Sequence, residues 1–291
     1  MVLAVREAGP DLISRYRRAV DGVIKSQGRL QDSEVRDMLR TLTGVRRELM
    51  EELRGIPAVD KSWRPEQLRQ LRGAIERAAE TFASRYGVNI RDGIDGSWRA
   101  GTGFMATTLN AIGISGAFET ALSQAQLEVA HQLTGQLIRS VSQSFRDQAS
   151  RQITLGVMGA KSPFAIMQDV AGLLRTQPER GAYGPIANQS ERIVRTELNR
   201  TFSIANEIRQ EEVSRDVPGL RHYWLTAGDG RVRPEHAAAG ARYGPPGIPK
   251  GQAFNVGGEK LRFPHDPAGS AANTIACRCV AVAYHERWFN G

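Results

Sequence analysis

The chain has 291 residues, of which 41% are hydrophobic, 24% are charged and only 7% are aromatic. This length suits one large domain or two modest ones, and the hydrophobic share excludes disorder throughout. The net charge is +8, and most of the basic residues are arginines. Half of this net charge lies in residues 220–291, which is compatible with a nucleic acid as a binding partner. No run approaches the roughly 20 apolar residues of a membrane-spanning helix, and no secretory signal is evident, so we expect a soluble protein made in a cytoplasm.

The first part of the chain has the spacing of amphipathic helices. Apolar residues recur every three or four positions over 12–23, 35–53 and 68–86. Glycines such as Gly28 and Gly87 follow these stripes and predict helix ends. Three helices with short connections predict antiparallel packing of a bundle or hairpin type.

A glycine-rich segment and a charge-poor segment follow. The glycines of 88–104 predict a loop that acts as a hinge. Between 100 and 138 the only charged residues are two glutamates, although apolar residues keep helical spacing. This stretch is either a buried core helix or a helix that packs against another protein. In the second interpretation Phe118, Leu122 and Val129 are candidate partner-binding residues.

The remaining elements predict a mainly helical α+β fold. Ser162 and Pro163 have the pattern of a helix cap followed by a first-turn proline. The expected elements, in order, are a helix to about residue 175, a loop over 176–187, a helix over 190–214, and strands over 222–226 and 279–284. We therefore expect mainly helical structure over the N-terminal two-thirds of the chain and a small, loop-rich α+β domain at its C-terminal end.

An ordered set of motif residues occupies this C-terminal region. In chain order they are Glu197, Trp224, Asp229, Arg231, His236, Gly240, Pro264, Asp266, Pro267, Cys277, Arg278 and Cys279. Over about residues 165–285 the order resembles the phage head-morphogenesis family typified by protein F of bacteriophage Mu. The resemblance implies a head-morphogenesis domain over 161–291, preceded by a helical region of unknown family over 1–160. The chain departs from that family's pattern in a longer, proline-rich stretch at 244–249. It also has Ile275 and Ala276 where Asn or Gly often precedes the first cysteine.

The resemblance implies a minor head protein of a tailed bacteriophage or prophage. Such proteins associate with the portal inside the capsid, near the portal vertex, and act in head assembly, DNA packaging or delivery. The implied partners are the portal protein, capsid or scaffold proteins and packaged DNA, and the implied location is the virion. No catalytic residues are expected.

The residue types add a physical interpretation of the Asp-x-Arg motif. A buried Asp229 could accept hydrogen bonds from Arg231 or from the turn backbone, and so pin the loop that presents His236. We favour this staple, which involves no chemistry.

The two cysteines are separated by one residue, and a disulfide framework is excluded because no others exist to pair with them. His236, Cys277 and Cys279 could converge as ligands of a structural zinc ion, with His265 as a further candidate, because imidazole and thiolate suit tetrahedral zinc. Against zinc, the usual structural knuckle has two residues between its cysteines, and the family does not fix a histidine at position 265. Packed thiols without metal remain the alternative, which we prefer.

Two other functions compete with the head-protein interpretation. The arginine excess favours a non-specific DNA-binding protein, although no recognition motif accompanies it. An ADP-ribosyltransferase-like toxin relative is supported only by analogy of fold, and the Glu-x-Glu signature of such enzymes is missing from the C-terminal region.

Overall fold

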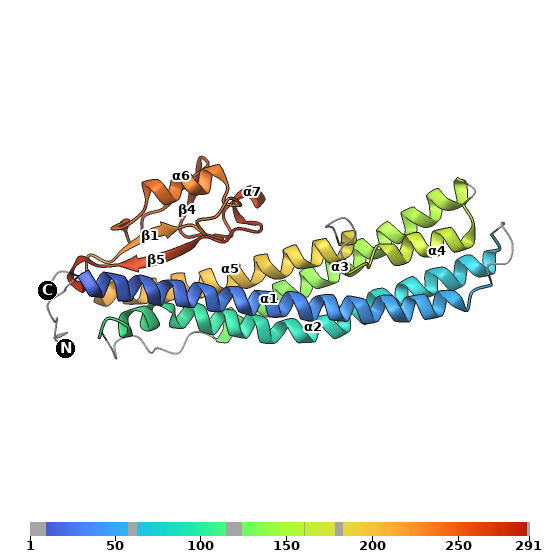
Figure 1. Ribbon diagram of the computed structural model, residues 1–291, viewed down its shortest axis with the longest axis horizontal. Coiled ribbons are helices and arrows are strands. Elements are labelled where there is room, and N and C mark those ends of the chain that lie inside the picture. Colours follow the sequence, from blue (N-terminus) through green and yellow to red (C-terminus); the bar gives the residue numbers. More distant parts are fainter. Residues whose placement is uncertain (1–9, 58–62, 115–123, 160, 178–182, 290–291) are drawn as a thin grey trace. The chain divides into compact units, whose positions relative to one another are not determined.

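The computed structural model describes residues 10–57, 63–114, 124–159, 161–177 and 183–289. The mainly helical α+β class predicted from the sequence is confirmed (Figure 1). Contacts divide the chain into two compact units. Unit 1 comprises residues 1–31, 93–128 and 195–291, and unit 2 comprises 32–92 and 129–194. The two units are interleaved in the sequence, whereas the expected domains, 1–160 and 161–291, follow one another along the chain.

Five helices make up most of the chain. They are α1 (Pro10–Arg54), α2 (Pro65–Asn110), α3 (Gln124–Met158), α4 (Pro163–Gly172) and α5 (Pro185–Asp216). The predicted break at Gly28 is wrong, because α1 is a single helix. Its apolar stripe is interrupted there by Gln27 and Gln31, which are buried in place of apolar residues. The second helix begins at Pro65 and continues through Gly87, so the predicted helix end at Gly87 is wrong.

The loop predicted over 88–104 is also wrong, because this segment lies inside α2. Two of its glycines, Gly96 and Gly101, allow close helix packing within unit 1. A Cβ on Gly101 would overlap the carbonyl oxygen of Phe202 on α5, and one on Gly96 would lie 3.0 Å from Leu30 on α1. The boundary between the units falls in this segment, between residues 92 and 93.

Unit 2 is built from helices that contact one another through apolar and charged residues. Its buried residues include Leu42, Leu49, Leu71, Phe82, Tyr86, Val141, Phe145 and Ile166. Ion pairs join α1 to α2 through Glu52 and Arg77 at 2.7 Å, and α2 to α3 through Glu76 and Arg146 at 2.6 Å. The predicted Ser162 cap is confirmed, since its hydroxyl accepts a hydrogen bond from the Ala165 amide at 3.2 Å.

The described part of the charge-poor stretch is divided between core and surface. Phe104, Met105 and Leu109 on α2 belong to the core of unit 1, whereas Val129 on α3 is 63% exposed. Phe118 and Leu122 lie outside the described residues, as do residues 178–182 of the predicted loop. No helix within the described ranges combines the length and apolar character needed to cross a lipid bilayer.

Unit 1 contains the small strands and short helices of the C-terminal region. The elements are β1 (Arg221–Leu225), α6 (Pro234–Arg242), β2 (Ile248–Pro249), β3 (Phe254–Val256), β4 (Glu259–Leu261), α7 (Ala271–Thr274), β5 (Val280–Tyr284) and a 3-10 turn, η1 (Glu286–Trp288). An antiparallel sheet has the order β2-β1-β5, and β3 and β4 form a hairpin. The two predicted strands are confirmed as β1 and β5, which pair so that Trp224 faces Ala281.

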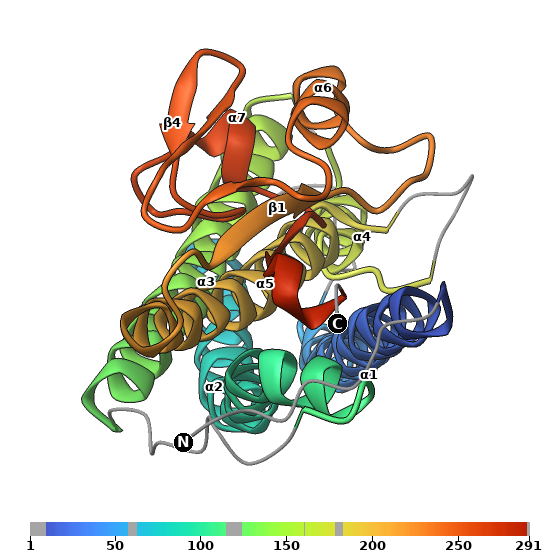
Figure 2. The ribbon, with the colours of Figure 1, turned by 90° about the vertical axis from the view of Figure 1, so that its left-hand side faces the viewer.

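Both faces of this sheet are covered. Successive residues of a strand point to opposite faces, so Tyr223 and Trp224 enter different clusters. Tyr223 packs with residues of α1, α2 and α5, including Tyr16 and Phe202. Trp224 packs with residues of α6 and the β3–β4 hairpin. Figure 2 shows α6 and β4 on one side of β1 and α5 on the other. The sheet therefore separates a helical core from a small second core, and the motif residues border the second.

Candidate metal centre

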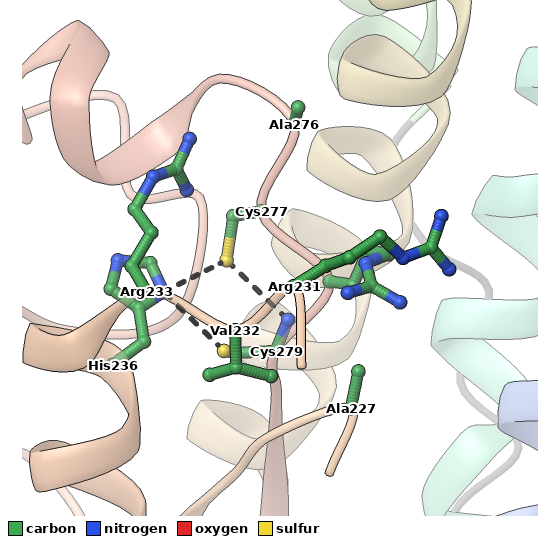
Figure 3. A pocket seen from close by; sticks show the side chains of 9 residues that line it. Ala227, Arg231, Val232, Arg233, His236, Ala276, Cys277 and Cys279 are labelled. Carbon is green, nitrogen blue, oxygen red and sulfur yellow. Dashed lines mark hydrogen bonds between the residues drawn. The ribbon is translucent and has the colours of Figure 1, made fainter. Parts of the chain in front are cut away.

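His236 and the two cysteines converge on one point of the second core. His236 lies in the first turn of α6, whose start is set by Pro234 at a position that tolerates proline. Cys277 and Cys279 lie between α7 and β5, and the Cys279 amide donates to the Cys277 sulfur at 3.4 Å. Figure 3 shows the imidazole directed toward both sulfur atoms.

The separations suit a tetrahedral metal ion. The Nδ1 atom of His236 lies 3.5 Å from the Cys277 sulfur and 3.4 Å from the Cys279 sulfur. The three ligand atoms are buried and lie within 4.8 Å of one another. Zinc bonds of about 2.0–2.3 Å in a tetrahedral arrangement separate ligand atoms by roughly 3.5 Å. The sequence-predicted trio is thus brought together at metal-binding distances.

Asn273 orients the imidazole of His236. Its Oδ1 atom lies 3.2 Å from His236 Nε2, and its amide nitrogen donates to the Val256 carbonyl at 3.3 Å. With the proton on Nε2, the lone pair of Nδ1 points toward the thiols. A hydrogen bond to the far nitrogen is the usual support of a metal-binding histidine.

The surroundings favour a thiolate at Cys277. A hydrogen bond from Cys279, together with the nearby His265 and His236, lowers the pKa of Cys277 against the opposing effect of burial. The same bond and burial raise the pKa of Cys279, so this thiol keeps the shared proton. The hydrogen bond with Cys277 raises the pKa of His236. Metal ligands must be deprotonated, and one thiol of the pair is already predisposed to lose its proton.

Polar residues of α5 hold the cysteine segment in place through hydrogen bonds. The sequence did not predict this contact. Thr196 accepts a hydrogen bond from the Ala276 amide at 3.0 Å, and Asn199 donates to the Cys277 carbonyl at 3.0 Å. Asn206 donates to the Ala281 carbonyl of β5 at 2.8 Å. Polar residues at helical spacing were the available signal. Glu197 on this helix is buried and pairs with Arg200 at 2.7 Å.

Asp229 fixes its loop through hydrogen bonds, as expected, but its side chain is not buried. Its carboxylate is 39% exposed and binds the Arg278 guanidinium through two hydrogen bonds of 2.6 Å. It also accepts from the Arg231 amide at 3.0 Å, and the Arg231 side chain lies 3.4 Å away. The bonds from Arg278 hold the pKa of Asp229 well below its usual range. The principal partner is therefore Arg278, between the two cysteines, rather than Arg231.

Pro264 and Asp266 shape the turn between β4 and α7. Asp266 is buried and accepts hydrogen bonds from the Arg262 and Ala268 amides at 2.9 and 3.1 Å. Within this turn His265 has a positive φ of 69° and is fully buried. Its ring nitrogens lie outside the three-atom metal group.

Two other motif residues support α6. The Trp224 ring meets His236 edge-on, with centroids 5.6 Å apart. A Cβ on Gly240 would lie 2.7 Å from the Thr226 methyl group, so the helix approaches β1 closely only because this residue is glycine.

The centre has room for a single small species. A cavity of about 10 Å³ adjoins the sulfur atoms, and Arg231, Arg233 and Arg278 contribute to its lining (Figure 3). Within the described ranges, His236, Cys277 and Cys279 are the one group of three His, Cys, Asp or Glu residues that could hold a metal ion.

No protein-family model, curated protein or solved structure matches the chain.

Proposed function

We propose that the chain is a minor head protein of a tailed bacteriophage or prophage, with a structural rather than a catalytic role. One observation carries the proposal: motif residues in the family's order cooperate within a single compact unit. Asp229 binds Arg278 across 49 positions, and His236 contacts both Cys277 and Cys279. Residues that share a family order and also hold one another in place support a common module.

The character of the module supports the structural role. Its motif residues form staples and close packing contacts, and the cavity beside the thiols holds no more than about one water molecule. Such a site offers no room for an organic substrate. The module would serve as an anchoring platform within the head, near the portal vertex.

We further propose that His236, Cys277 and Cys279 hold a structural zinc ion. The donor set, the separations near 3.5 Å, the burial and the support from Asn273 all fit this metal. Zinc there would tie α6 to the segment before β5 and contribute directly to folding free energy.

Metal analysis of the purified chain tests the zinc proposal. We expect about one equivalent of zinc per chain, and chelation should lower the melting temperature because the ion binds only the folded state. His236→Ala should lose the metal, whereas His131→Ala, on α3 of unit 2, should retain it. A wild-type protein that contains no metal, and whose melting temperature does not change when a chelator is added, would contradict the proposal.

The portal is the proposed partner, through the charge-poor segment 105–138, in which Phe118, Leu122 and Val129 are the candidate contact residues. Support comes from the scarcity of charge and from the exposure of Val129, which leaves this side chain accessible. Association through apolar packing should persist as salt rises. Contacts with DNA phosphates, in contrast, weaken steeply with salt.

Co-purification with the portal oligomer of the same phage or prophage tests this partner. Replacing Phe118, Leu122 and Val129 with Asp should abolish co-purification while unit 1 stays folded by near-UV circular dichroism. Val88→Asp is the control, because Val88 on α2 is also exposed. A folded triple variant that still binds would reject this surface, and salt-sensitive DNA binding without portal binding would favour the DNA-binding alternative.

A further inference from the structure

We propose that a second cavity of unit 1 binds a single, neutral aromatic ring that carries an N–H or O–H group. This cavity, here called the α1–α5 cavity, has a volume of about 190 Å³ and lies between α1, α5 and the start of β5. Its occupation depends neither on the metal centre nor on the proposed place in the phage head, so the three proposals stand or fall separately.

The volume of the α1–α5 cavity admits one small ring. An engineered apolar cavity of about 150 Å³ binds benzene, whereas sites for drug-sized molecules range from about 300 to 1,000 Å³. At about 190 Å³, the α1–α5 cavity has room for a benzene ring with one small polar substituent. The cavity beside the thiols, at about 10 Å³, has no such room.

Apolar side chains form the walls of the α1–α5 cavity. Ile24 of α1, Phe202 of α5 and Val280 of β5 all line it. Phe202 and Val280 are buried in the core of unit 1, and Ile24 packs against the same core. A ring held among them would bury its apolar surface and contact the phenyl ring of Phe202. These walls favour an aromatic ligand over an ion or a sugar.

Gln27 provides the polar atom that selects the ligand. This lining side chain is 5% exposed, and its Nε2 atom donates to the Ser97 hydroxyl at 3.0 Å and to the Leu198 carbonyl at 3.2 Å. A carbonyl oxygen can only accept, so the amide orientation is fixed and Gln27 presents Oε1 to a ligand. Among the described residues, Oε1 has no hydrogen-bond partner. A buried acceptor of this kind favours a ligand that brings an N–H or O–H group.

Other polar side chains of the lining are engaged in contacts of their own. Gln31 donates to the Asn199 side-chain oxygen, and Asn199 donates to the Cys277 carbonyl at 3.0 Å. The Arg278 guanidinium binds both carboxylate oxygens of Asp229. An anionic ligand would have to compete with Asp229 for this arginine. The expected ligand is therefore neutral.

The lining runs from the surface to the core. Ala227 is exposed and the Arg278 side chain is 32% exposed, whereas Gln27 and Phe202 are buried. A ring from solvent can therefore enter on the side of Ala227 and place its polar group against Gln27.

Phenol and toluene test the proposal on the full chain, because they have nearly the same shape and differ in the O–H group. Phenol should shift the methyl resonances of Ile24 and Val280 in methyl-labelled protein. It should bind about three- to tenfold more tightly than toluene, the factor expected of one net hydrogen bond. Unshifted methyl resonances up to the solubility limit of phenol, or equal affinity for toluene, would overturn the proposal.

Two substitutions locate the ring. A Cβ on Gly28, which lines the cavity, meets nothing within 4 Å, so Gly28→Leu should fill the cavity and abolish phenol binding. Gly22→Leu is the matched control, since Gly22 is an exposed residue of the same helix whose added Cβ also meets nothing within 4 Å. Gln27→Met should bind phenol and toluene equally. Unchanged phenol affinity in a folded Gly28→Leu variant would contradict the proposal, and if either variant fails to fold, the wild-type methyl shifts and the phenol-to-toluene ratio decide.

A third compound identifies the source of the ring. N-acetyl-tyrosinamide carries the same phenol group on a peptide backbone. If it binds at least as tightly as phenol, the proposal holds and the ring is a tyrosine side chain of a partner protein. If phenol binds and the blocked tyrosine does not, the proposal holds for a free small molecule. If neither compound binds, the proposal is wrong.

Discussion

Arg278 binds both carboxylate oxygens of Asp229 at 2.6 Å, across 49 positions of the chain. The pair joins the first part of the motif, the Asp-x-Arg turn, to its last part, the Cys-Arg-Cys segment. Because Arg278 lies between Cys277 and Cys279, the carboxylate also restrains the backbone that presents the two sulfur atoms. This contact holds the two ends of the motif together within unit 1.

Asp229→Asn should loosen this restraint and weaken zinc binding by about tenfold, the scale of lost support around metal ligands. Arg231→Gln is the matched control, since the Arg231 side chain is 80% exposed and lies 3.4 Å from the same carboxylate. Zinc affinities from chelator competition give the comparison. Equal losses in the two variants would show that the charge near the site, rather than the Arg278 contact, is what matters.

The glycines of α2 should respond in opposite directions. Gly101→Ala places a methyl group against the Phe202 carbonyl and should lower the free energy of unfolding by about 1–3 kcal/mol. Gly103→Ala meets nothing within 4 Å and should raise it by about 0.5–1 kcal/mol, because alanine restricts the unfolded chain. Urea unfolding measures both. A stabilised Gly101→Ala would mean that α2 and α5 do not pack closely here.

Ala276, the residue before the first cysteine, has a φ of +53°. The phage head-morphogenesis family, which the chain resembles, often has Asn or Gly before this cysteine. Ala276→Gly should therefore raise the free energy of unfolding by up to about 1 kcal/mol, since glycine adopts this backbone without a Cβ penalty. In the control, Ala272→Gly in α7 should lower it by about 0.5–1 kcal/mol. Destabilisation by both substitutions would refute the assigned backbone conformation.

His222 on β1 should make unit 1 sensitive to acid. Burial, followed by the nearby charge of Lys250, lowers the pKa of His222 to about 4, against roughly 6.5 in the unfolded chain. The unfolded state therefore takes up the proton first, and stability present above pH 6.5 is lost as pH falls toward 4. His222→Gln should reduce the loss of unfolding free energy between pH 7 and 4.5 by about 2–3 kcal/mol. Identical pH profiles would contradict the burial of a neutral imidazole.

Local signals in the sequence predicted the elements whose residues have a clear local preference. Ser162 caps its own helix, and the runs rich in strand-forming residues became β1 and β5, although these two strands are stabilised by pairing with each other far along the chain. The errors arose where tertiary packing overrides local preference. Buried Gln27 and Gln31 continue α1 through a gap in its apolar stripe, and Gly101 marks a helix contact rather than a turn.

The sequence predicted the candidate metal ligands but not the contacts that hold them in place. Residue type alone identified His236, Cys277 and Cys279, because few side chains combine as zinc ligands. The supporting contacts join residues far apart in sequence, such as Thr196 and Ala276 or Asp229 and Arg278. Spacing along the chain carries no signal for pairs of this kind, so only the fold identifies them.

Quantitative mass spectrometry of purified phage particles from the strain that carries this gene tests the central claim most directly. The account predicts that the chain is present in procapsids and remains associated with the portal fraction after the capsid is dissociated. Its copy number should be far below that of the major capsid protein. Procapsids that contain the portal and entirely lack this chain would contradict its role as a minor head protein.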